Sequence, residues 1–122
     1  DNAISRFRLM PPQPCAQEYV LEYIAKTSYR ETEQGWILKS DPKISSTYKY
    51  NDLHEMMMNP KTDLEIIYGQ LSQVFTPDVL DYMKYAGQLD ETKIHRLEGA
   101  MHHLFLDRPL EFKDLVLKIL EN

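Results

Sequence analysis

One stretch of the sequence decides the fold: it reads GAMHHLFLDRP and spans residues 99–109. The residues before it, KIHRL at 93–97, are a strand candidate. Pro109 suits the first turn of a helix, where no backbone N–H is needed. The predicted core face of this last helix is Phe112, Leu115, Val116, Ile119 and Leu120. The stretch is therefore a turn between a strand and a helix, and it carries the histidines His102 and His103.

A second strand and a second helix are predicted before this turn. Leu64–Tyr68 is a short run with β character, closed by Gly69, and its composition is typical of a strand buried on both faces. Thr76 and Pro77 open a helix, as N-cap and first helical residue, and Gly87 is placed to follow its end. The order strand, helix, strand, helix predicts a right-handed parallel β-α-β-α unit.

These segments together resemble the C-terminal part of the α/β-hydrolases. In that family the last core strand ends in a Gly-Ala-x-His turn, and an acidic residue, a polar residue and Pro open the final helix. The run IIYGQLS, residues 66–72, resembles the preceding strand with its loop. The resemblance covers residues 63–122. It implies the fold class α/β, as a C-terminal fragment of an α/β-hydrolase fold in which a helical cap remnant is followed by the β-α-β-α unit.

The resemblance places the family's catalytic histidine on His102. In acyl transfer a histidine takes the nucleophile's proton and returns it to the leaving group, and its near-neutral pKa suits both steps. The family often has its catalytic acid in a Gly-x-x-Asp loop, but here Ser72 occupies that place. Either the acid follows an earlier strand outside this chain, or this branch has lost it. The nucleophile, Ser or Asp, is also expected outside the chain, because no serine here has the Gly-x-Ser-x-Gly spacing.

Each histidine also has a plainer interpretation. His102 could be a satisfied core or loop residue, and the pair with His103 could hold a metal. However, adjacent side chains in an extended turn point apart, and no third ligand follows at helical spacing. His54 and His95 add no recognisable metal spacing. We therefore expect no metal and no cofactor.

The first sixty residues have a different character. Residues 11–14, PPQP, indicate a linker or extended segment, and residues 15–29 follow a helical pattern. Residues 33–36 indicate a turn, and residues 50–58 a short helix that ends before Pro60. This part resembles, more loosely, the end of the helical cap that the family inserts before its penultimate core strand.

We therefore expect two parts: residues 1–60 as linker and partial helical cap, and residues 61–122 as the C-terminal part of the hydrolase core. Two strands do not make a stable open parallel sheet. We expect a missing N-terminal half or a second chain, such as another copy in a homo-oligomer, to cover strand 64–68. The sequence does not begin with Met, which suggests a piece of something longer.

Composition narrows the remaining possibilities. The chain carries 14 Lys and Arg against 19 Asp and Glu, a net charge of −5, so we expect no nucleic-acid partner. No apolar run is long enough to cross a bilayer, so no membrane partner is expected. The single cysteine, Cys15, allows no internal disulfide and favours a reduced, cytoplasmic location.

These observations predict a hydrolase that acts on a small-molecule substrate, an ester, with His102 as its general base. Because this chain has a base and no nucleophile, it is expected to be inactive alone. The alternative is an independent, α-rich interaction module without catalysis. That reading explains the helices equally well, but it leaves the strand at residues 64–68 and the segment at residues 99–109 unexplained.

Overall fold

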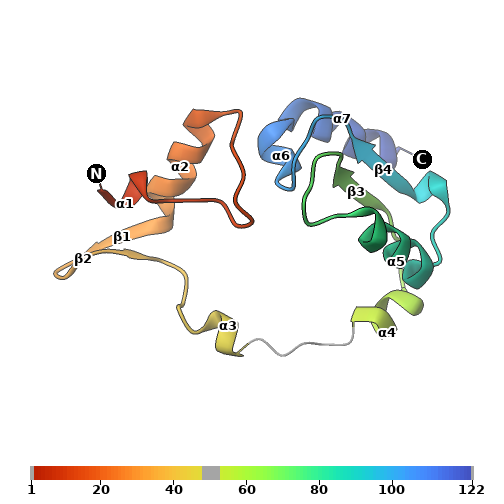
Figure 1. Cartoon of the computed structure of the whole chain (residues 1–122), viewed down its shortest axis with the longest axis horizontal. Coiled ribbons are helices and arrows are strands. Elements are labelled where there is room, and N and C mark those ends of the chain that lie inside the picture. Colours follow the sequence, from red (N-terminus) through yellow and green to blue (C-terminus); the bar gives the residue numbers. More distant parts are fainter. Residues whose placement is uncertain (1, 48–52, 122) are drawn as a thin grey trace. The chain divides into compact units, whose positions relative to one another are not determined.

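The computed structural model describes residues 2–47 and 53–121, and the chain divides into two compact units, Asp1–Tyr50 and Asn51–Asn122. Each unit is described by itself. The elements of the first unit are α1 (Asn2–Ser5), α2 (Glu18–Ser28), β1 (Tyr29–Thr32), β2 (Gly35–Leu38) and α3 (Ile44–Thr47) (Figure 1). None of the helices among the described residues has both the length and the apolar character needed to span a membrane.

The first unit contains a β-hairpin that was not predicted from the sequence. Strands β1 and β2 pair antiparallel, with Thr32 opposite Gly35, so the predicted turn at residues 33–36 joins two strands. Gly35 has a φ of 111°, a conformation that glycine adopts without steric cost. The hairpin escaped prediction because its two-residue connection lacks the Asn-Gly or Asp-Gly pair that is the strongest local hairpin signal.

The packing of the first unit is sparse. Its buried apolar side chains among the described residues are Leu9 and Ala25. The rings of Phe7 and Tyr29 meet edge to face, with centroids 6.4 Å apart. Helix α2 begins at Glu18, three residues after the predicted start at Cys15, and it ends where the hairpin begins.

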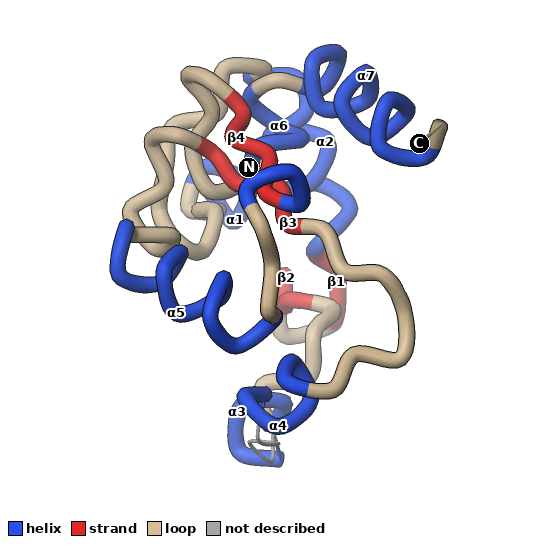
Figure 2. The backbone as a smooth tube through the Cα atoms, turned by 90° about the vertical axis from the view of Figure 1, so that its right-hand side faces the viewer, coloured by secondary structure: helices blue, strands red, loops and turns tan. Residues whose placement is uncertain are grey.

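The second unit has the predicted strand and helix order, preceded by the predicted short helix, and it adds one short helix and a 3₁₀ turn that were not predicted. Its elements are α4 (Leu53–Met58), β3 (Ile66–Gly69), α5 (Pro77–Gly87), η1 (Glu91–Lys93), β4 (Ile94–Leu97), α6 (Leu104–Asp107) and α7 (Pro109–Leu120). Strands β3 and β4 pair in parallel, from Ile66 opposite Ile94 to Gly69 opposite Leu97. Helices α5 and α7 lie on opposite sides of this strand pair (Figure 1; Figure 2). The parallel β-α-β-α unit is therefore confirmed.

The core of the second unit lies between the strands and these helices. Its buried apolar residues are Ile66, Ala86, Leu97, Ala100 and Leu106. Strand β3 begins two residues later than predicted, and Ile67 and Tyr68 are only half-buried, so full burial on both faces is not observed. On α7 the predicted core face is half-buried except at Leu120, whose side chain is 76% exposed.

Helix α4, at the end of the segment predicted as linker and partial cap, belongs to the second compact unit, which begins at Asn51. The His54 Nδ1 atom lies 3.0 Å from the Tyr82 hydroxyl of α5, and the His54 ring stacks on Tyr85 with centroids 6.4 Å apart. Tyr50, where the helix was predicted to begin, lies outside the described residues.

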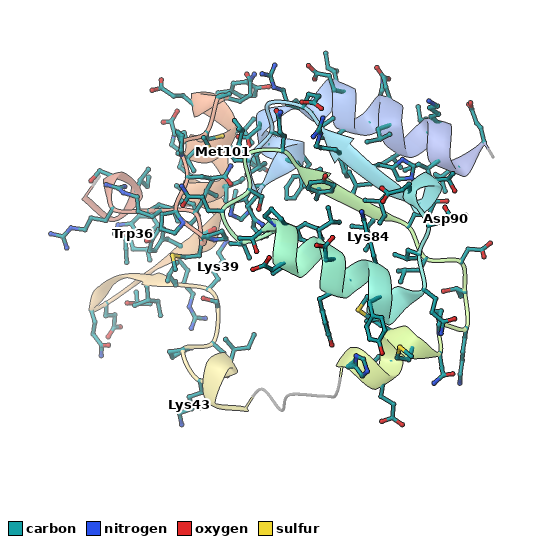
Figure 3. The ribbon with its side chains drawn as sticks, turned by 45° about the vertical axis from the view of Figure 1, so that its right-hand side comes forward. Trp36, Lys39, Lys43, Lys84, Asp90 and Met101 are labelled. Carbon is teal, nitrogen blue, oxygen red and sulfur yellow. The ribbon has the colours of Figure 1, made fainter. Side chains whose placement is uncertain are left out.

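The connection from α5 to β4 is fixed by polar contacts (Figure 3). Helix α5 includes Gly87, which was predicted to follow its end, and the next residue, Gln88, adopts a left-handed conformation (φ 51°). Lys84 forms a 2.6 Å ion pair with Glu91, whose carboxylate raises the pKa of the lysine. Asp90 accepts the Thr92 backbone N–H at 2.8 Å and also its hydroxyl, and these bonds lower the pKa of Asp90. These contacts position the start of β4.

Candidate active site

The two loops that follow β3 and β4 form the candidate site. Because the strands run parallel, their carboxyl ends lie at the same edge of the sheet, and the loops that leave them start side by side. The loop after β3 carries Ser72, and the loop after β4 carries His102. Residues 30 positions apart in the sequence are therefore brought together by the pairing of the strands.

Backbone hydrogen bonds join the two loops. The Gln70 N–H donates to the Leu97 carbonyl at 3.0 Å, and the Leu71 N–H donates to the Ala100 carbonyl at 2.8 Å. In return, the Gly99 N–H donates to the Gln70 side-chain oxygen at 2.9 Å. The loops therefore continue the ladder of the sheet past the ends of the strands, and the turn before His102 has little freedom to move.

Gly69 allows this close approach. A Cβ atom at this position would lie 2.1 Å from the Met101 carbonyl oxygen and 2.6 Å from that of Ala100. Both obstacles are backbone atoms, which cannot move aside as a flexible side chain can. Glycine is thus required at the last position of β3, where the strand backbone lies against the turn that carries His102. Glycine is common where two backbones approach this closely.

His102 and Ser72 are in direct contact. The Ser72 Oγ atom lies 3.2 Å from the His102 Nδ1 atom, and both side chains are half-buried. The Phe75 backbone N–H donates to the same Ser72 oxygen at 3.1 Å and so fixes the hydroxyl in place. The imidazole is therefore engaged by the serine through Nδ1, and Nε2 is on the far side of the ring.

Asp107 holds the other side of the turn. Its carboxylate accepts the backbone N–H of Met101, labelled in Figure 3, at 2.8 Å. The sequence suggested only that Asp107 helps to open the last helix, whereas it ends α6 and reaches back to the residue before His102. The ring of His103 meets that of His102 edge to face at 5.5 Å. Among the described residues, no group of three or more His, Cys, Asp or Glu side chains is placed to hold a metal ion.

A second charged cluster lies at the opposite end of the strands and was not predicted. The Glu65 carboxylate, just before β3, contacts Lys93 at 2.9 Å and His95 Nε2 at 2.5 Å. The hydrogen bond from Lys93, followed by that from His95, lowers the pKa of Glu65, and Glu65 in turn raises the pKa of Lys93. Because this cluster is at the amino ends of the strands, it is separate from the Ser72–His102 contact.

Comparison with solved structures identifies the fold. The chain matches "Crystal Structure of E-2-(Acetamidomethylene)succinate Hydrolase" with a TM-score of 0.73 and 12% identity, over 87% of this chain and 40% of that one. It also matches "Thioesterase Domain From Curacin Biosynthetic Pathway" with a TM-score of 0.68 and 22% identity, over 95% of this chain and 41% of that one. No protein-family model matches, and no curated protein matches by sequence.

The chain therefore has an α/β-hydrolase fold, as the turn at residues 99–109 predicted. It spans about 40% of the length of the two structures that it matches.

Proposed function

We propose that this chain is part of a hydrolase in which His102 is the general base. The observation that carries the proposal is the contact between Ser72 Oγ and His102 Nδ1. In hydrolytic triads the group at Nδ1 orients the ring, and Nε2 takes the proton of the nucleophile. A histidine whose Nδ1 is held by the loop after the neighbouring strand fits the role of such a base.

The substrate that we propose is a small ester. The nucleophile is supplied from outside these 122 residues, at a strand-to-helix elbow that the described residues do not contain. The second edge of β3 is the place where further strands of the same sheet would pair. The thioesterase among the matched structures makes a thioester the natural second substrate to assay.

The direct test uses a longer protein that includes this sequence. It should hydrolyse p-nitrophenyl acetate or an acyl thioester, while the 122-residue chain alone should not. His102→Ala should lower kcat by about a thousandfold or more, as expected for a triad member. His54→Ala is the matched control, because it removes a histidine of the same unit that contacts α5. Hydrolysis that survives His102→Ala would refute the proposed role, and absence of hydrolysis would favour the non-catalytic module.

The geometry can be tested separately from catalysis. A carboxylate at residue 72 would favour the charged imidazole, whereas an amide of the same shape would not. In the 122-residue chain, the ¹⁵N NMR signals of the His102 ring should therefore differ between Ser72→Asp and Ser72→Asn at the same pH. Identical signals in the two variants would mean that residue 72 does not face the ring in solution.

A further inference from the structure

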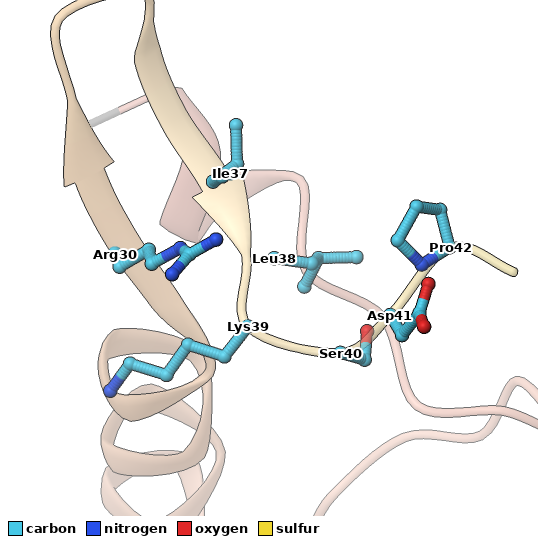
Figure 4. Close-up of a pocket in the computed structure, with 7 residues that line it drawn as sticks. All are labelled: Arg30, Ile37, Leu38, Lys39, Ser40, Asp41 and Pro42. Atoms are coloured by element: carbon cyan, nitrogen blue, oxygen red, sulfur yellow. The ribbon is translucent and has the colours of Figure 1, made fainter. Parts of the chain in front are cut away.

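The first unit carries a pocket that the proposed hydrolytic site does not include (Figure 4). It lies at the open end of the β1–β2 hairpin, where the chain turns from Leu38 toward Pro42, and its volume is about 530 Å³. That volume falls within the usual range for sites that bind small molecules.

The hairpin places two cationic side chains on one face of this pocket. Arg30 on β1 is opposite Ile37 on β2, and the Lys39 N–H donates to the Ser28 carbonyl at 2.8 Å, which extends the ladder by one step. Alternate residues of a strand share a face, so Arg30, Ile37 and Lys39 lie on the same side of the hairpin. Figure 4 shows the Arg30 side chain reaching toward β2 and the Lys39 side chain running from the end of β2 toward β1.

The charge of the pocket differs from that of the chain, which has a net charge of −5. Within the part of the chain that the structure describes, neither Arg30 nor Lys39 forms an ion pair. Asp41 is the one acidic residue that lines the pocket, and its carboxylate accepts the backbone N–H of Lys43 at 2.8 Å. Apart from Ser40, the other residues that line the pocket are apolar, and Ile37 is one of them. Two cations beside an apolar wall are complementary to an anion that carries an apolar group.

We propose that this pocket binds a small amphipathic anion, namely a carboxylate or phosphate monoester on an apolar chain. The planar guanidinium of Arg30 suits two-point contact with either oxyanion, and Lys39 adds a second positive charge. Ile37, which lies on the same face as the two cations, provides apolar contact for the attached chain. This inference does not depend on the proposed hydrolytic activity, because it concerns only residues of the first unit.

The experiment uses the 122-residue chain, whose single tryptophan, Trp36, is next to Ile37 and reports on the hairpin by fluorescence. Octyl phosphate and octanoate are titrated as monomers, with octanol and inorganic phosphate as controls that carry only one part of the ligand. The amphipathic anions should bind at least about tenfold more tightly than octanol. Arg30→Gln should weaken the binding of the amphipathic anions about tenfold. Arg6→Gln makes the same charge change at an exposed residue outside the pocket and should leave their affinity unchanged.

Several outcomes would overturn the proposal. Octanol that binds as tightly as octyl phosphate would show that only apolar contact is involved. Equal losses of affinity in Arg30→Gln and Arg6→Gln would show that binding depends on the overall charge of the chain and not on the pocket. Binding to anionic phosphatidylglycerol vesicles without binding to the monomeric ligands would indicate a membrane surface in place of a pocket. If Arg30→Gln alters the far-UV circular dichroism, Lys39→Gln repeats the test, because it keeps the backbone bond that extends the ladder.

Discussion

Gly69 offers the sharpest test of the geometry around His102. In Gly69→Ala, the new Cβ would lie 2.1 Å from the Met101 carbonyl oxygen, whereas ordinary contacts begin at 3.4 Å. The turn or the strand must therefore shift by about 1 Å, and the turn is held by the bond from the Leu71 N–H to the Ala100 carbonyl. Overpacking of this kind typically costs about 1–3 kcal/mol, and the upper part of that range applies because the obstacle is backbone.

The variant can be assayed by urea unfolding followed by circular dichroism, with Gly87→Ala as the matched control. The atoms nearest to a Cβ at residue 87 belong to the side chains of Leu89 and Leu64, at 3.0–3.3 Å, and alanine gains helix propensity there. The control should change the free energy of unfolding by less than about 1 kcal/mol. Gly69→Ala should also separate Ser72 from His102, visible as a changed imidazole NMR signal. A Gly69→Ala variant as stable as the control, with that signal unchanged, would refute the reasoning.

The two acids around the strands give further predictions. Lys93 and His95 lower the pKa of Glu65 in the folded protein. The ionised carboxylate should therefore add its full contribution to the free energy of unfolding above the ordinary pKa of about 4.5, and this contribution should be lost as the pH falls through the lower pKa of the folded state. Glu65→Gln should therefore reduce stability at pH 7 and flatten its acid dependence in urea melts from pH 7 to 3; parallel curves for the two proteins would contradict this. Asp107→Asn keeps the shape of the side chain and an oxygen that can accept the Met101 N–H, but it removes the negative charge that strengthens this bond, and it should cost about 1 kcal/mol in the same melts. Faster hydrogen exchange at Met101 should accompany that loss, and unchanged exchange would show that the bond does not hold the turn.

The parts of the fold that sequence predicted are those with a strong local pattern. The turn from Gly99 to Pro109 has its glycine, histidine and helix-opening proline at fixed spacing, and both the strand before it and the helix after it were found where expected. The hairpin was also missed because β2 reads Gly-Trp-Ile-Leu, without the alternation of apolar and polar residues that marks a half-buried strand, and all four of its residues are exposed. The start of β3 was placed two residues early because the strand pairs with β4 only from Ile66 onward, and no local pattern reveals where pairing with a distant segment begins.

Sequence predicted the location of the candidate site better than its chemistry. Counting along a motif placed His102 in the turn and Ser72 in the neighbouring loop, and the two residues are in contact. The contacts that hold them, from Gly69 and Asp107, depend on backbone atoms of other segments and could not be read from residue types alone.

The serine limits where a catalytic acid could act. His102 Nδ1 has room for one hydrogen-bond partner in the plane of the ring, and Ser72 Oγ occupies it at 3.2 Å. An acid from elsewhere must therefore displace Ser72 or act through it. A hydroxyl can do the second: it can accept from Nδ1–H and from the Phe75 N–H while donating its own proton to a carboxylate. Such an acid would stabilise the imidazolium less than an acid in direct contact, because its charge would lie one hydrogen bond farther from the ring.

The relay can be tested in the longer protein. If Ser72 relays an acid, Ser72→Ala should abolish the activity that depends on His102, and Ser72→Asp should restore it by placing a carboxylate next to the ring. If neither substitution changes kcat, Ser72 has only a structural role beside His102.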